Sequence, residues 1–211
     1  ESGQLLDYLS GTQRNMDTVK VSLEKYENNL KTIRGLINKE TDYEKALIGY
    51  ENVPQPRISD VTLDVALYPC EPRAVTRGTY VIQNRTDKPL DEVHVRWLKP
   101  LQMTKLDVEG AKLKQEHAGQ DYRIYQFDRP MVPLEVRRIT FETLREQKGF
   151  RNSDNERRIV RNGTFLDNTE IAPMLGMSRE GLLQERAKRR KHGLPPELRP
   201  AKLEDESARA F

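Results

Sequence analysis

The sequence of 211 residues has one cysteine, three histidines, one tryptophan and no long apolar run. Because Cys70 stands alone, the chain cannot form an internal disulfide, and cysteine usage indicates no redox compartment. No stretch approaches the roughly 20 apolar residues of a membrane-spanning helix, and the first residues lack the apolar centre of a signal peptide. Any membrane span of the parent protein is therefore expected outside this chain.

The sequence motifs of several enzyme classes are also missing. His94, His117 and His192 do not begin a His-Glu-x-x-His segment, and no two of them lie one helical turn apart. The chain has no Gly-x-Ser-x-Gly elbow and no glycine-rich phosphate loop, and Glu71 beside Cys70 disfavours a reactive thiolate. We therefore predict no catalytic, cofactor-binding or metal-binding residues here, and the chain alone is not expected to be an enzyme.

Charge gives little direction toward a partner. The 36 basic and 33 acidic residues leave a net charge of only +3, which does not predict binding to nucleic acid or to an anionic membrane. The basic run from Arg186 to Lys191 could contact phosphates. A solvated helix face, with positive charges near the helix C-terminus, is the simpler interpretation.

Residues 1–52 favour helix, since the first 50 contain no proline and carry apolar residues at alternating spacings of three and four. These residues are Leu5, Leu9, Met16, Val19, Leu23, Tyr26, Leu30, Ile33 and Ile37, with Thr12 as the one polar interruption. Because Gly11 and Gly35 weaken the pattern, we predict a main helix over Thr12–Ile37 and a second over Thr41–Tyr50. The stripe fits a coiled coil, or an apolar face that lies on the domain or on a neighbouring subunit.

The period changes after Pro54-Gln55-Pro56, which ends the helical region. From Arg57 to Pro69 apolar and polar residues alternate, as in a half-buried strand. Further alternating runs cover Arg77–Gln83, Glu92–Leu98, Thr104–Val108, Tyr122–Asp128 and Glu135–Leu144. Turn-forming residues separate them at 84–89, 109–110, 118–120 and 129–130. Short strands without intervening helices predict an antiparallel β-sandwich or saddle, with Trp97 in its core.

The last third departs from this pattern. A polar stretch over Gln147–Arg157 precedes a short apolar run over Ile159–Leu166. A helix is predicted over Ser178–His192, with Gly193 as its stop. Pro195, Pro196 and Pro200 predict an extended segment after it, and the tail over Ala201–Phe211 is expected to be loosely held. The chain is thus expected to be mainly β, with N-terminal helices and a short C-terminal helix. Its segments are a juxtamembrane-type helical part at 1–52, a sandwich domain at 53–146 and an extension of that domain at 147–211.

Several short motifs, taken in order, resemble a known family. They are Tyr43-Glu44-Lys45, Pro54-Gln55-Pro56-Arg57-Ile58, Val61-x-Leu63-Asp64-Val65-x-Leu67-Tyr68-Pro69, Arg77-Gly78-Thr79-Tyr80, Asn84-x-Thr86, Asn162-Gly163-Thr164-Phe165 and Ile171-x-Pro173-x-Leu175-Gly176. The sequence from 43 to 177 resembles bacterial proteins in which an ABC-transporter-type permease is fused to an aminopeptidase-N-like zinc metallopeptidase. Cys70 and Met177 depart from that pattern, where an acidic residue and a tyrosine are expected.

The resemblance implies a position within a larger membrane protein. In that family the matching region follows a membrane helix and precedes the catalytic domain, so it implies an N-terminal β saddle on the periplasmic or extracytoplasmic face of a bacterial membrane. The expected partners are the catalytic peptidase domain and the permease part of the same protein, with a homodimer through the N-terminal helix as a further option. Zinc is expected in the catalytic domain, and no zinc ligand or catalytic glutamate can be carried over to this chain.

Two other readings remain open from the residues alone. The first is a periplasmic β-sandwich that binds a peptide or protein and dimerises through the N-terminal helix, which the stripe of apolar residues favours. The second is a small hydrolase in its own right, for which no acid, base or nucleophile pair stands out. Measured zinc content would separate the hydrolase from the other readings, and the oligomeric state would test the helix-driven dimer.

Overall fold

The computed structural model describes residues 2–147 and 158–195, and the chain divides into two compact units. The helical unit comprises Glu1–Lys45 and Glu180–Phe211, and the sandwich unit comprises Ala46–Arg179. The predicted fold class, mainly β with antiparallel sheets, an N-terminal helix and a short C-terminal helix, is confirmed. The expected extended tail and most of the polar stretch before residue 158 lie outside the described residues. Among the described residues, no helix has the length and apolar character needed to cross a bilayer.

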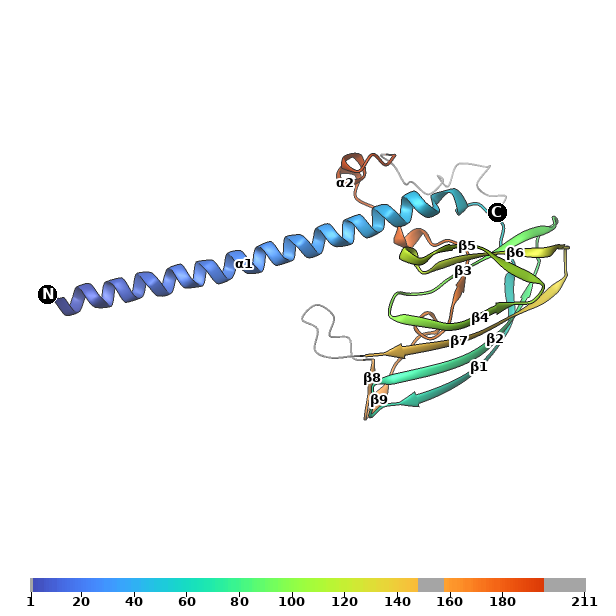
Figure 1. Cartoon of the computed structure of the whole chain (residues 1–211), viewed down its shortest axis with the longest axis horizontal. Coiled ribbons are helices and arrows are strands. Elements are labelled where there is room, and N and C mark those ends of the chain that lie inside the picture. Colours follow the sequence, from blue (N-terminus) through green and yellow to red (C-terminus); the bar gives the residue numbers. More distant parts are fainter. Residues whose placement is uncertain (1, 148–157, 196–211) are drawn as a thin grey trace, which may run out of the picture. The chain divides into compact units, whose positions relative to one another are not determined.

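The N-terminal region is one continuous helix, α1 (Ser2–Leu47), followed by the short 3₁₀ turn η1 (Ile48–Tyr50), as Figure 1 shows. The prediction of separate helices at Thr12–Ile37 and Thr41–Tyr50 is therefore wrong. A glycine costs a helix about 1 kcal/mol relative to alanine, which is too little to break a long run of good helix formers at Gly35. The helical region does end before Pro54, as predicted.

The helical unit also contains the C-terminal helix α2 (Arg186–Lys191), which is much shorter than the predicted Ser178–His192. A separate 3₁₀ turn, η4 (Arg179–Gly181), precedes it at the boundary between the units. Between them Leu182 and Leu183 are buried, and the Leu183 N–H donates to the Glu44 carboxylate at 3.3 Å. These contacts hold the segment between η4 and α2 in a non-helical conformation. Gly193, at φ +70°, follows α2 as the predicted stop.

A buried ion pair ties α2 to α1 within the helical unit. Arg189, with a side chain only 1% exposed, donates to both oxygens of Glu44 at 2.7 and 2.6 Å. The same guanidinium donates to the carbonyl oxygens of Leu183 at 2.6 Å and Pro195 at 2.7 Å. The prediction that the basic run is a solvated helix face is therefore wrong at Arg189. A bidentate pair supported by further hydrogen bonds is the geometry in which burying two charges is tolerated.

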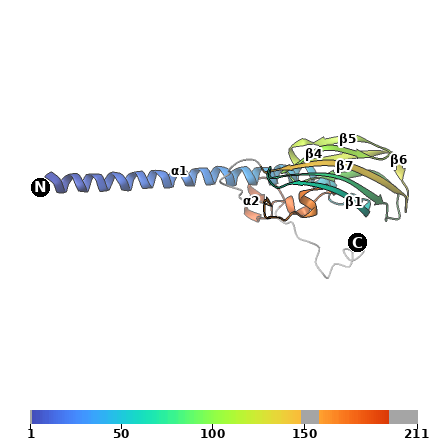
Figure 2. The same cartoon turned by 90° about the horizontal axis from the view of Figure 1, so that it is seen from below.

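The sandwich unit contains two antiparallel four-stranded sheets and a small hairpin (Figures 1 and 2). Sheet A has the order β1 (Arg57–Tyr68), β2 (Arg73–Gln83), β7 (Val136–Glu146) and β4 (Leu101–Val108). Sheet B has the order β10 (Met174–Leu175), β3 (Leu90–Arg96), β6 (Tyr122–Met131) and β5 (Ala111–His117). The hairpin joins β8 (Ile159–Val160) and β9 (Gly163–Thr164). The described part of this unit also contains the 3₁₀ turns η1, η2 (Ala118–Gln120) and η3 (Asn168–Glu170).

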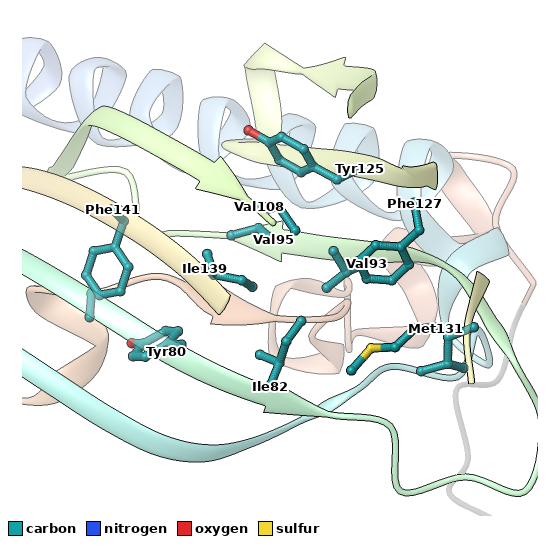
Figure 3. Packing of buried hydrophobic residues seen from close by; sticks show 12 residues of the cluster. Tyr80, Ile82, Val93, Val95, Val108, Tyr125, Phe127, Met131, Ile139 and Phe141 are labelled. Carbon is teal, nitrogen blue, oxygen red and sulfur yellow. The ribbon is translucent and has the colours of Figure 1, made fainter. Parts of the chain in front are cut away.

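The core lies between the two sheets and is built from alternate residues of their strands, as Figure 3 shows. Tyr80, Ile82, Ile139 and Phe141 come from sheet A. Val93, Val95, Tyr125 and Phe127 come from sheet B. Tyr80 and Phe141 pack at 4.8 Å between ring centroids. Each fully buried side chain of this size contributes about 1.5–3 kcal/mol, so this layer dominates the stability of the unit.

Three local predictions differ from the structure. Strand β5 was not predicted, because Leu113 is its one large apolar residue and this edge strand is mostly exposed. The turn predicted at Arg129-Pro130 is wrong, since β6 continues to Met131 and the chain turns over residues 132–135. Trp97 lies just beyond β3, only partly buried, with the Arg123 guanidinium 5.2 Å from its ring centroid, so its placement in the core is wrong.

Candidate functional site

A chain of polar side chains crosses sheet B around the buried His94 of β3. Lys114 Nζ lies 2.6 Å from one oxygen of Glu92, and the other Glu92 oxygen lies 2.9 Å from His94 Nε2. His94 Nδ1 lies 2.6 Å from the hydroxyl of Tyr122. The side chain of His94 is 1% exposed, that of Glu92 17% and that of Lys114 50%. His94 thus lies within a strand and is buried.

Burial and the surrounding polar side chains favour the neutral form of His94. Burial lowers the pKa of His94 below its ordinary value of 6.5, and the hydrogen bond and charge of Glu92 oppose this only in part. Burial raises the pKa of Glu92, but the hydrogen bonds from Lys114 and His94 outweigh it, so the net pKa is lowered. The arrangement assigns the proton to Nε2, which donates to Glu92, while Nδ1 accepts from Tyr122.

The backbone of His94 joins segments that are distant in sequence. Its N–H donates to Oε1 of Gln55 at 2.8 Å, and its carbonyl accepts from the Gly176 N–H at 2.9 Å. The ring of Tyr50 meets the His94 ring edge-on at 5.1 Å. Both nitrogens of His94 are engaged and its side chain has almost no exposure, so no substrate can reach it as a general base. These contacts fasten Tyr50, Gln55 and Gly176 to strand β3.

A second set of polar contacts fixes the segment after β9 to the inner face of sheet A. The Tyr80 hydroxyl donates to the Pro173 carbonyl at 3.0 Å, and the Thr143 hydroxyl donates to the Ile171 carbonyl at 2.5 Å. Burial raises the pKa of Tyr80 to about 12, which keeps this donor protonated. Glu170, directly before Ile171, pairs with Arg145 at 2.8 Å, with both side chains 9% exposed. These three contacts account for the short irregular segment that sequence periodicity did not reveal.

Two hollows on the surface of the sandwich unit are small and have charged residues in their walls. One of about 250 Å³ lies among charged residues at Glu109, Asp128, Arg129, Glu135 and Arg137. The other, of about 270 Å³, lies over Thr62, Thr79, Thr140 and their charged neighbours in sheet A. Ligand pockets usually enclose about 300–1,000 Å³, so both hollows fall just below that range. Among the described residues, no group of three or more His, Cys, Asp or Glu side chains could hold a metal ion.

The most distinctive surface is the edge strand β1. It is twelve residues long, pairs only with β2 within the described sheets, and shows no buried position. Leu63 points to the inner face, since its Cδ2 lies 2.8 Å from where a Cβ on Gly78 would stand and it packs against the core. Val61, Val65 and Leu67 share this face by the two-residue period of a strand, and they are 51%, 36% and 44% exposed. We call Val61, Leu63, Val65 and Leu67 the β1 apolar row.

The structure assigns structural roles to several residues on which the sequence resemblance depends. Val61–Tyr68 forms most of β1, and Arg77–Tyr80 lies in β2. Asn84 is fully buried, and its side-chain nitrogen donates to the carbonyl oxygens of Lys88 and Met131 at 2.8 and 2.7 Å. Gly176 adopts φ +73°, which only glycine accommodates readily. Cys70, the lone thiol, is exposed in the turn after β1.

Comparison with known proteins gives a limited result. No protein-family model and no curated protein matches this sequence. The structural neighbours are M1 zinc metallopeptidases at low coverage. One is a mutant M1 zinc metallopeptidase from Deinococcus radiodurans bound to a Tyr-Ser-Ala substrate, which is 16% identical over 49% of this chain and 23% of its own, with a TM-score of 0.36. A two-domain M1 zinc metallopeptidase mutant bound to L-tryptophan is 16% identical over 49% of this chain and 24% of its own, at the same TM-score of 0.36. This match spans about a quarter of the length of these metallopeptidases.

Proposed function

We propose that this chain is the extracytoplasmic, non-catalytic N-terminal saddle of a membrane-tethered zinc aminopeptidase. The parent protein would be of the permease-fused kind that the sequence resembles, with its zinc site in a separate catalytic domain. The observation that carries this proposal is the exposed β1 apolar row on a long, open strand edge. A strand of this length with an uncovered apolar face is a surface that native proteins normally cover.

The covering partner under this proposal is the catalytic domain of the same polypeptide. The inner face of sheet A is already closed over β2 and β7 by the segment that carries Ile171 and Pro173. Toward β1 this cover ends, and Val61, Val65 and Leu67 continue the inner face with 36–51% of each side chain exposed. A neighbouring domain that packs along β1 would bury this row. The role of the chain would then be to support and shape the catalytic domain rather than to bind zinc itself.

Zinc content and peptidase activity test the catalytic part of the proposal. The purified 211-residue chain is compared with a longer version that continues through the downstream coding sequence. We expect the shorter chain to hold no stoichiometric zinc and to leave leucine p-nitroanilide intact. The longer version should bind one zinc ion and hydrolyse leucine p-nitroanilide. Stoichiometric zinc or turnover in the shorter chain would overturn the proposal, and so would a downstream sequence without a His-Glu-x-x-His segment.

A second candidate function is the binding of an extended peptide or protein segment by the sandwich itself. The open edge of β1 favours it, because a strand added there would gain main-chain hydrogen bonds and place alternate side chains on the β1 apolar row. Titration of a fluorescent library of extended peptides against the chain separates the two candidates. Saturable binding that Val65→Lys abolishes and Thr62→Lys leaves intact would favour the binding module.

A further inference from the structure

Helix α1 carries an apolar seam that the described structure leaves bare. The seam consists of Met16, Val19, Leu23, Tyr26, Leu30, Ile33 and Ile37. The first six are between 48% and 69% exposed, and Ile37 is half-buried. Seven large apolar residues on one helix face are far more than the scattered exposed apolar residues of an ordinary surface. The exposed apolar residues therefore indicate that this stretch of α1 packs against another element.

The spacing of the seam identifies the shape of its occupant. Its residues follow one another at three, four, three, four, three and four positions, an average of 3.5 residues. A helix that packs on a sheet or a globular domain needs a wider stripe, with a third apolar position in each seven. The flanking positions here are instead polar at Lys20, Glu27 and Arg34 on one side. A narrow seam with a period of 3.5 residues fits another helix in a left-handed coiled coil.

The flanking residues identify that helix as a second α1. In a parallel, in-register pair of helices, the residue just before Leu23 or Leu30 lies beside the residue just after Tyr26 or Ile33 of the partner helix. Ser22 would then face Glu27 of the second copy, and Asn29 would face Arg34. The charged side of one helix meets the neutral side of the other, so self-pairing brings no like charges together.

The two ends of the seam agree with this assignment. Seven residues after Ile37, Glu44 lies on the same face and is buried by Leu183 and Arg189 of its own unit. The same face of α1 is therefore covered by residues of its own unit at Glu44, and it becomes exposed one heptad earlier in the sequence. From Met16 to Ile37 the seam extends about 32 Å at 1.5 Å per residue, and in the sequence the spacing continues to Leu9 and Leu5. The three heptads from Met16 to Ile37 reach the length at which such a pattern indicates a coiled coil.

We propose that α1 pairs through this seam with α1 of a second copy of the chain, which makes the protein a coiled-coil oligomer. This inference does not depend on the proposed peptidase role, because it concerns a different surface and a different measurement. The helical unit supplies the interface, and the β1 apolar row of the sandwich unit stays available for another partner.

The test is the mass of the full chain in sedimentation equilibrium. Its variants are L23Q/L30Q, in the seam, and Val21→Gln, a matched control on the opposite face of the same helix, where Val21 is 66% exposed. We expect the unaltered chain and the control to sediment at a multiple of 24.5 kDa and the double variant at 24.5 kDa. The dissociation constant of the double variant should rise about a hundredfold or more.

Two results would overturn the inference. One is a monomer for the unaltered chain at concentrations where the sandwich is soluble and folded. The other is an oligomer whose mass is the same in L23Q/L30Q and in the unaltered chain, which would place the interface elsewhere. Trp97 fluorescence verifies that the sandwich unit of each variant is folded, since the chain's one tryptophan lies there. A loss of helical circular dichroism in the double variant, together with the monomer mass, supports the inference, because it shows that α1 needs its partner to stay helical.

Discussion

At the scale of single residues, the titration of His94 is coupled to the folding of the sandwich unit. His94 is buried and neutral, with one nitrogen bonded to Glu92 and the other to Tyr122. Its folded pKa is lowered, chiefly by burial, from an ordinary value of 6.5. The unfolded chain therefore takes up a proton near pH 6.5 that the folded chain resists until lower pH. The stability that neutral His94 provides is complete above pH 6.5 and is lost as the pH falls below it.

The lowered pKa of His94 predicts a measurable dependence of the free energy of unfolding on pH. Between pH 6.5 and the lowered folded pKa, the free energy of unfolding should fall with decreasing pH by up to about 1.4 kcal/mol per unit. His94→Gln should lower the stability at every pH, because an amide cannot reproduce both hydrogen bonds, but it should remove this slope. Urea unfolding followed by Trp97 fluorescence at pH 7.5, 6.5 and 5.5 measures both. Equal slopes in the variant and the unaltered chain would show that His94 is not the titrating group.

At the scale of the strand, Gly78 of β2 lets three strands of sheet A come together. A Cβ at this position would lie 2.2 and 2.5 Å from ring atoms of Phe141 in β7 and 2.8 Å from Leu63 in β1. Gly78→Ala should therefore force these side chains apart and destabilise the sandwich unit by about 1–3 kcal/mol. Gly163→Ala is the matched control, since a Cβ there meets no atom within 4 Å. Urea unfolding of both variants checks this, and a loss no larger for Gly78→Ala than for Gly163→Ala would contradict it.

The elements that the sequence predicted correctly are those with a regular apolar period. Strands β1, β2, β3, β4, β6 and β7 were each predicted from alternating apolar and polar residues, although the bounds of some moved. Strand β5 carries Leu113 as its one large apolar residue and gains its place from hairpin pairing with β6, which its own weak apolar pattern does not encode. The same holds for the segment that Tyr80, Thr143 and Arg145 hold in place.

The polar sites were less predictable than the strands. The pairing of Glu44 with Arg189 spans 145 residues, and neither residue carries a sequence signal that distinguishes it from its charged neighbours. The Glu92–His94 pair lies within one strand and has a weak signal, since a histidine two positions from a glutamate lies on the same strand face. Its burial depends on Tyr122 and Tyr50, which only the folded chain brings together.

At the scale of the whole molecule, the β1 apolar row and the α1 seam are two separate apolar surfaces. They lie in different units, and their spacings, two residues and 3.5 residues, suit a sheet surface and a helix respectively. Under the proposals above, the seam joins copies of the chain and the row joins the sandwich to the catalytic domain. A parent protein assembled in this way would present two or more catalytic domains on one coiled-coil stem.

The proposed domain interface can be tested by a change on β1 whose effect depends on the length of the chain. Val65→Lys places a charge in the β1 apolar row, at a position 36% exposed, whereas Thr62→Lys places the same charge at an exposed position on the outer face of the same strand. In the 211-residue chain both variants should unfold close to the unaltered protein, because both lysines reach water. In the version that includes the downstream catalytic domain, Val65→Lys should bury its charge at the interface and destabilise it by about 2 kcal/mol or more.

Thermal unfolding of the four proteins, with the two unaltered chains as references, measures that difference. If Val65→Lys and Thr62→Lys behave alike in the longer protein, β1 is not covered by the catalytic domain, and its open edge is left for the peptide-binding role. If Val65→Lys lowers the unfolding temperature only in the longer protein, the row is a domain interface. A general destabilising effect of lysine on strand β1 would also appear in the 211-residue chain. It therefore cannot lower the unfolding temperature of the longer protein alone.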